Sequence, residues 1–79
     1  MNAFEARQQT LWNNLPYIIQ DKIMFNVSQG QYECLSISCE EAERKMKRAN
    51  IKAILEELGY TVSFSDDGKY YKISWRKYD

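Results

Sequence analysis

The 79-residue sequence predicts one α+β domain with the element order α-α-β-α-β-β and a small three-stranded antiparallel sheet. The supporting observations are two segments with a helical apolar period, a capping signal that begins a further helix, and three segments in which apolar and polar residues alternate. Two cores would leave each with too few residues to fold, so one domain over 1–79 is expected. The expected elements are helices over about 2–13 and 15–28, a strand over 32–38, a helix over 39–58, and a hairpin over 60–65 and 69–76.

The first two helices have clear boundary signals. Asn2 is a residue type that caps the start of a helix, and Pro16 disfavours helical backbone at the residue before it. Pro16 suits the first turn of the second helix, and Gly30 supplies the conformation that often ends one. The apolar face of the first helix is Phe4, Leu11 and Trp12, and that of the second is Leu15, Ile19, Ile23 and Val27.

The three strands are expected to pair in the order 1-3-2, with helices covering one face. The last strand carries the largest side chains, which suits a central position, and every neighbouring pair is then antiparallel. Residues on the covered face are expected to be Leu35, Ile37, Val62, Phe64, Tyr71, Ile73 and Trp75. Residues on the open face are expected to be Cys34, Ser36, Thr61, Ser63, Tyr70, Lys72 and Ser74.

The helix over 39–58 has a start signal and an end signal. Ser38 and Glu41 have the spacing of a capping box, and Gly59 suits a left-handed cap. Apolar residues lie on two opposite sides of this helix, so it is expected either to be wedged between the sheet and the first two helices or to keep one side for a partner. The two stripes are Ala42, Met46, Ala49 and Ala53, and Ile51, Ile54, Leu55 and Leu58.

Five basic residues on this helix allow two interpretations: Arg44, Lys45, Lys47, Arg48 and Lys52. In the first, the basic helix 44–52 enters a nucleic-acid groove and the C-terminal hairpin contacts the backbone. In the second, the charges are solvated and paired, since all except Arg48 lie four positions from a glutamate. Asp66 and Asp67 at the hairpin tip would repel phosphates, which favours the second interpretation.

The overall charge does not favour nucleic acid or a membrane surface as a partner. Eleven basic and eleven acidic residues give a net charge of zero. Residues 1–43 carry two basic and six acidic side chains, while residues 44–79 carry nine and five, so the two parts have net charges of −4 and +4. Complementary contact between copies of the chain, or with a charged protein, is therefore open.

The open sheet face is the candidate interaction surface. Tyrosines beside small polar residues are typical of protein interfaces, so we expect a protein partner there, and a homo-oligomer is also open. Stacking of single-stranded bases on the exposed rings is the alternative. The candidate residues are Tyr32, Tyr70, Lys72, Trp75, Arg76 and Tyr78.

Catalytic groups are scarce, so we expect no enzymatic activity, no cofactor and no metal. The sequence has no histidine, and two cysteines alone cannot supply the four ligands of a zinc site. Cys34 and Cys39 are expected as free buried thiols, because strand alternation places them on opposite faces. Neither a signal peptide nor a membrane span fits the pattern, so a cytoplasmic protein is expected.

Three segments resemble short uncharacterised proteins encoded by tailed bacteriophages. They are the run Ile18 to Gly30 leading into a strand, Leu58-Gly59-Tyr60 followed by Val62, and Tyr71-Lys72-Ile73-Ser74-Trp75. The resemblance implies a phage accessory or virion-associated protein that acts by binding a host or phage protein, in the host cytoplasm or in the virion. It implies no catalytic residues.

Overall fold

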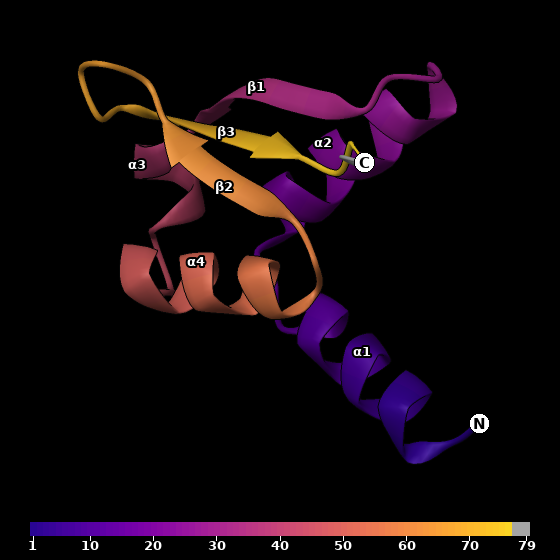
Figure 1. Cartoon of the computed structure of the whole chain (residues 1–79). Helices are drawn as coiled ribbons and strands as arrows, with labels where there is room; N and C mark the ends of the chain where they lie inside the picture. The colour runs from indigo at the N-terminus through magenta and orange to yellow at the C-terminus, as the bar shows by residue number, and fades with distance from the viewer. Residues whose placement is uncertain (77–79) are drawn as a thin grey trace.

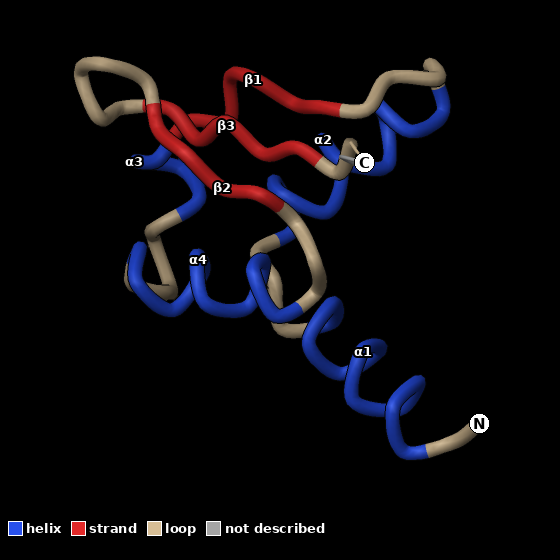
Figure 2. The backbone as a smooth tube through the Cα atoms, in the orientation of Figure 1, coloured by secondary structure: helices blue, strands red, loops and turns tan. Residues whose placement is uncertain are grey.

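A computed structural model describes residues 1–76 and contains, within them, four helices and a three-stranded sheet (Figures 1 and 2). The strand order is β1-β3-β2 and both neighbouring pairs are antiparallel, which confirms the predicted α+β fold and sheet order. Helices α2, α3 and α4 lie on one face of the sheet and leave the other face open (Figure 1). In chain order the elements are α1 (Ala3–Asn13), α2 (Tyr17–Ser28), β1 (Glu33–Ser38), α3 (Cys39–Ala42), α4 (Arg48–Glu57), β2 (Thr61–Phe64) and β3 (Tyr70–Ser74).

Local capping explains most of these boundaries. The Asn2 side chain accepts a hydrogen bond of 2.8 Å from the backbone amide of Glu5, as its residue type predicts. Gly59 has φ +97° after α4, and the next amide, that of Tyr60, donates to the carbonyl of Leu55 at 3.0 Å. This is the Schellman arrangement, in which a left-handed residue turns the chain while the last helical carbonyls keep hydrogen-bond partners.

The prediction of one helix over 39–58 is wrong, because a turn over 43–47 separates α3 from α4. At 100° per residue, an unbroken helix would place the buried residues of α3 about 170° away from those of α4. The turn redirects the chain, so both short helices bury their apolar side against the same core. The two opposite apolar stripes in the sequence result from this break between α3 and α4. The residues buried by α3 and α4 are Cys39, Ala42, Ile51 and Leu55.

Strand β1 contains a bulge that changes which residues face the helices. Cys34 lies opposite Ile73 and Ile37 lies opposite Tyr71, so two residues of β1 stand against one residue of β3. Cys34 is therefore buried, and Leu35 is 53% exposed. The alternation predicted the reverse for both residues, because it assumes an unbroken period of two.

The core lies between the sheet and helices α2 to α4. Both thiols are free, as predicted, but they are buried in the same core and not on opposite faces. Val62, Phe64 and Trp75, predicted for the covered face, are half-buried at its margin. Among the described residues, no helix combines the length and apolar character needed to cross a bilayer. The buried residues are Leu15, Ile19, Ile23, Cys34, Ile37, Cys39, Ala42, Ile51, Leu55, Tyr71 and Ile73.

Candidate functional site

The five basic residues do not form a basic helix face, because the break after α3 separates them. Three of them lie in the turn over 43–47, and two belong to α4. Arg44 and Lys45 in the turn are exposed and line a hollow of about 620 Å³ beside Pro16. Only Lys52 makes the predicted ion pair within a helix, with Glu56 at 2.9 Å.

Arg48, predicted to lack an acidic partner, is the most engaged of the five. Its Nε donates to Glu43 Oε2 at 2.7 Å, and its Nη2 donates to the carbonyl of Gly68 at 2.9 Å. Its guanidinium lies 4.9 Å from the centre of the Phe64 ring. The hydroxyl of Tyr71 donates to the same Glu43 oxygen at 2.7 Å. These contacts join the turn after α3 to the β2–β3 hairpin. The role of Arg48 is therefore structural.

The pKa shifts of Glu43 and Tyr71 favour their structural hydrogen bonds over proton transfer. Burial acts to raise the pKa of Glu43, but the hydrogen bonds from Arg48 and Tyr71 outweigh it and lower the pKa overall. Burial, and then the hydrogen bond to the Glu43 carboxylate, raise the pKa of Tyr71 far above its ordinary value of 10.0. Near neutral pH the carboxylate is therefore charged and the phenol is protonated.

The two thiols show no sign of activation. Burial is the main cause that raises the pKa of both Cys34 and Cys39 above their ordinary value of 9.0. Arg48 acts to lower the pKa of Cys39, but Glu43 and Asp67 oppose it. Within residues 1–76, no group of three or more cysteine, aspartate or glutamate side chains is placed to hold a metal ion.

The open sheet face carries the predicted residues of the hairpin and one that alternation had assigned to the core. Lys72 is exposed and pairs with Ser63 of β2, and its neighbour Tyr70 is 42% exposed. The bulge places Leu35 and Ser36 opposite Lys72 on the other side of β3. An apolar side chain of β1 thus extends the surface that the tyrosine and the lysine begin.

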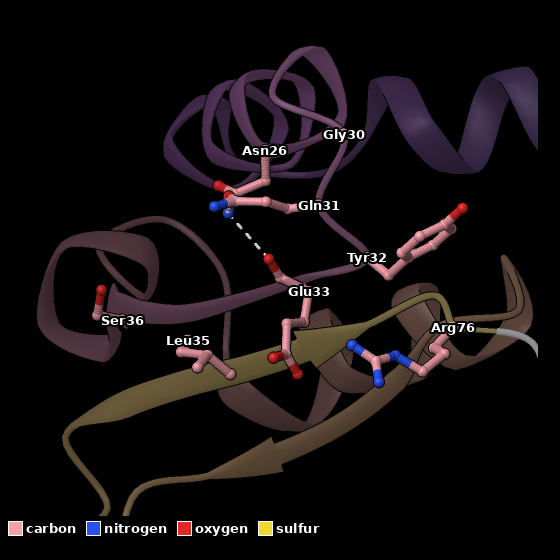
Figure 3. Close-up of a pocket in the computed structure, with 8 residues that line it drawn as sticks. All are labelled: Asn26, Gly30, Gln31, Tyr32, Glu33, Leu35, Ser36 and Arg76. Carbon is pink, nitrogen blue, oxygen red and sulfur yellow. Dashed lines mark hydrogen bonds between the residues drawn. The ribbon is translucent and has the colours of Figure 1, made fainter.

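A hollow of about 440 Å³ lies between this face and the loop after α2 (Figure 3). Its lining includes a cation and an anion, two side-chain amides, and an aromatic and an aliphatic side chain. Figure 3 shows Glu33, Leu35 and Arg76 along the sheet and Tyr32 at the end of the loop. The lining residues are Asn26, Gly30, Gln31, Tyr32, Glu33, Leu35, Ser36 and Arg76.

Asn26, in the last turn of α2, holds one side of this hollow in place by two hydrogen bonds. Its Nδ2 donates to the carbonyl of Glu33 at 2.9 Å and to Oε1 of Gln31 at 2.6 Å. The first bond binds the last turn of α2 to the start of β1 and occupies a backbone acceptor of this edge strand. The sequence marks Asn26 only as a polar residue of a helix, so its role could not be predicted.

Four of the six predicted interaction residues lie on or beside the open sheet face. Tyr32 and Arg76 line the hollow at one end of the β1–β3 pair, Lys72 lies at its middle, and Tyr70 lies at the other end, opposite Ser38. Trp75 is half-buried and packs edge-on against Tyr60, with ring centres 6.0 Å apart. Tyr78 lies outside the described residues. We refer to the open face and its hollow as the outer sheet surface, defined by Tyr32, Glu33, Leu35, Tyr70, Lys72 and Arg76.

Comparison of the chain with protein-family models, with curated proteins and with solved structures found no match. The function has therefore to be inferred from the surfaces of this chain.

Proposed function

We propose that this protein is a non-enzymatic interaction module that binds another protein through the outer sheet surface. The observation that carries the proposal is the bulge, which leaves Leu35 53% exposed beside Tyr32, itself 58% exposed. A regular strand would bury this leucine, whereas here it lies where a partner can cover it. Tyr70 adds a third large side chain on the same sheet face.

The chemistry of the hollow supports a polypeptide as the ligand. Arg76 and Glu33 offer one charge of each sign, and the side-chain amides of Asn26 and Gln31 can donate and accept hydrogen bonds. An apolar centre with a mixed polar rim is the usual composition of a protein interface. Nucleic acid would require a larger excess of positive charge than Lys72 and Arg76 give over the acidic Glu33.

The biological role that we propose is that of a phage accessory protein, acting on a host or phage protein. It is supported by the resemblance of three segments of this chain to short proteins of tailed bacteriophages, and it needs no catalytic group. The cytoplasm of the host cell is the proposed site of action.

The test compares proteins captured from a bacterial lysate, with and without phage infection, by the wild-type chain and by Leu35→Ser. Leu35 is 53% exposed and does not belong to the buried core, so this variant is expected to fold normally and to lose at least about 90% of the specifically captured protein. Tyr17→Ser is the matched control, because Tyr17 is 81% exposed at the opposite end of α2. A captured protein that Leu35→Ser retains as well as Tyr17→Ser would contradict the proposal.

A salt titration with single-stranded and double-stranded oligonucleotides tests the alternative of nucleic-acid binding. No binding is expected even at low salt, where phosphate contacts are strongest. Binding that falls with added salt and is lost in the double variant Arg44→Ala/Lys45→Ala would instead support a nucleic-acid-binding domain.

A further inference from the structure

Helix α1 lies largely outside the folded body. It projects away from the sheet and the other helices (Figure 1), and none of its side chains is buried. Its C-terminal end is held by α2, where Gln20 Nε2 donates to the carbonyl of Trp12 at 2.6 Å. An isolated helix of 11 residues is marginal in water, so α1 gains stability if a partner covers it.

The partly exposed apolar stripe of α1 has a self-complementary order. Phe4, 65% exposed, lies near the N-terminal end, and the half-buried Leu11 and Trp12 lie near the C-terminal end, where Trp12 also packs against the core. Gln8 falls between them on the same face at 100° per residue. When a second α1 packs in the opposite direction, each Phe4 meets the Leu11 and Trp12 of the other copy, and the two Gln8 side chains meet each other.

We infer that two copies of this chain associate through α1, paired antiparallel about a two-fold axis at Gln8. The occupant is a second copy because the stripe matches itself when reversed, as a two-fold interface requires. A glutamine amide has both a donor and an acceptor, so two Gln8 side chains can hydrogen-bond to each other across the axis. Glu5 and Arg7 lie on the two edges of the stripe, Glu5 next to Trp12 and Arg7 next to Leu11.

A neighbouring hollow extends this contact surface beyond α1. It has a volume of about 430 Å³ and is lined almost entirely by apolar side chains. Trp12 belongs both to the α1 stripe and to this lining, so the two surfaces are continuous. In the antiparallel pair, the N-terminal end of one α1 reaches this hollow on the other copy. The lining residues are Trp12, Ile23, Met24, Val27, Ser28 and Tyr60.

The exposed apolar side chains fit a small interface. Met1, Phe4, Met24 and Val27 are each more than half exposed, and the pairing covers all four. Together with the stripe residues they would bury about 400–500 Å² on each copy, which is below the range of stable specific interfaces and in that of weak, transient ones. A reversible dimer with a dissociation constant of about 1–100 μM is therefore expected.

The first test is the oligomeric state of the full chain by sedimentation between about 1 μM and 1 mM, which spans the dissociation constant expected for this area. The wild type is expected to pass from monomer to dimer. Phe4→Ser is expected to raise the dissociation constant at least about tenfold, because the interface loses the most exposed ring of the stripe. Tyr17→Ser, which removes a more exposed ring outside the stripe, is expected to change nothing.

The second test examines the register by charge exchange at the axis. Gln8→Glu alone and Gln8→Lys alone are each expected to be monomeric, because like charges meet. An equimolar mixture is expected to form a heterodimer at least as stable as the wild-type dimer. A wild type that stays monomeric throughout, or a mixture that stays monomeric while the wild type dimerises, would overturn the inference.

These outcomes are independent of the proposed function. The α1 stripe and the outer sheet surface share no residue, so a monomer that still captures its protein partner through Leu35 would refute the dimer alone. Loss of capture by Leu35→Ser, conversely, leaves the α1 pairing unaffected.

Discussion

Glu43 shows how one residue holds the turn that the sequence did not reveal. One carboxylate oxygen, Oε2, accepts hydrogen bonds from Arg48 and from the buried hydroxyl of Tyr71. The carboxylate side chain is 23% exposed, so its bonds are only partly screened by water. Because Tyr71 is fully buried in β3, Glu43 anchors the turn to the centre of the sheet.

The first prediction is that Glu43→Ala lowers the free energy of unfolding by about 2 kcal/mol, because it leaves a buried hydroxyl without a partner. Adding Tyr71→Phe to this variant is expected to restore about 1 kcal/mol, since the unpaired hydroxyl is then removed. Urea unfolding followed by circular dichroism measures both changes. Glu57→Ala, at an exposed position, serves as the control and is expected to stay within about 0.5 kcal/mol of the wild type. If the double variant Glu43→Ala/Tyr71→Phe is no more stable than Glu43→Ala, the assigned hydrogen bond between Tyr71 and Glu43 is contradicted.

The second prediction concerns acid. The pKa of Glu43 is lowered in the folded state, so the folded protein binds fewer protons there than the unfolded chain does. Its stabilising contribution is therefore present above its ordinary pKa of 4.5 and is lost as the pH falls below that value. The difference in unfolding free energy between the wild type and Glu43→Gln should shrink between pH 5 and about pH 3. An undiminished difference at about pH 3 would show that the charge of Glu43 is not the cause.

The third prediction concerns alkali. Burial raises the pKa of Tyr60 and Tyr71, so their contribution to stability is present below the ordinary value of 10.0 and fades as the pH rises through the folded-state pKa. In an ultraviolet titration, Tyr60 and Tyr71 should ionise only well above their ordinary value of 10.0 and together with unfolding. Tyr71→Phe should remove one late-ionising group. Complete ionisation near pH 10 with the fold intact would contradict their burial.

At the scale of elements, two irregularities decide which side chains are buried and which are exposed. The bulge in β1 moves Leu35 to the open face and Cys34 to the core, and the turn over 43–47 directs both α3 and α4 onto that core. An unbroken helix over 39–58 would leave apolar residues on the wrong side, and burial of each large side chain, which gains about 1.5–3 kcal/mol, accounts for the turn. The bulge in β1 has the opposite effect, because it covers a cysteine and exposes a leucine.

The fourth prediction follows from the bulge. Leu35→Ser should change the free energy of unfolding by less than about 0.5 kcal/mol, because the side chain is exposed. Cys34→Ser should lower it by about 1–3 kcal/mol, because a hydroxyl replaces a buried thiol. Thermal and urea unfolding of the two variants measure the difference. The opposite ranking would mean that β1 is a regular strand with Leu35 in the core.

At the scale of the whole molecule, the core is confined to the sheet and to α2, α3 and α4. Helix α1 adds no buried residue, so its stability is linked to whatever covers it. The outer sheet surface and the α1 stripe lie on different parts of the molecule, which allows one protein partner and a second copy to bind together. A core of this size supplies only about 3–5 kcal/mol, so association would add a substantial share of the total stability.

The fifth prediction is that amide exchange in α1 depends on protein concentration. Below the dissociation constant of the dimer, the amides of residues 3–13 should exchange fastest among the helices, because their opening requires no global unfolding. Above that constant, their exchange should slow by about tenfold, while the amides of β3 change little. Exchange measured by mass spectrometry at two concentrations decides this. Rapid exchange of α1 at both concentrations would contradict pairing through this helix.

The sequence by itself determined the features that depend on neighbouring residues. Asn2 and Ser38 accept the predicted cap hydrogen bonds, and Gly59 ends α4 in the left-handed conformation. Alternation located all three strands to within one or two residues, and the large side chains of β3 indicated its central place. The free state of both thiols was also predictable. These features follow from local backbone chemistry and from the burial of apolar side chains.

Only the tertiary structure decided where regular periods fail. The sequence of β1 keeps alternating, yet its pairing with β3 accommodates one extra residue and exchanges the sides of Cys34 and Leu35. The residues over 39–58 have caps for one helix, but their two apolar sides can share a core only if the helix breaks. The partner of Arg48 lies five positions away across that break, and Tyr71 joins it from another element. Such arrangements depend on contacts between distant segments, and the sum of those contacts outweighs the local preferences of the chain.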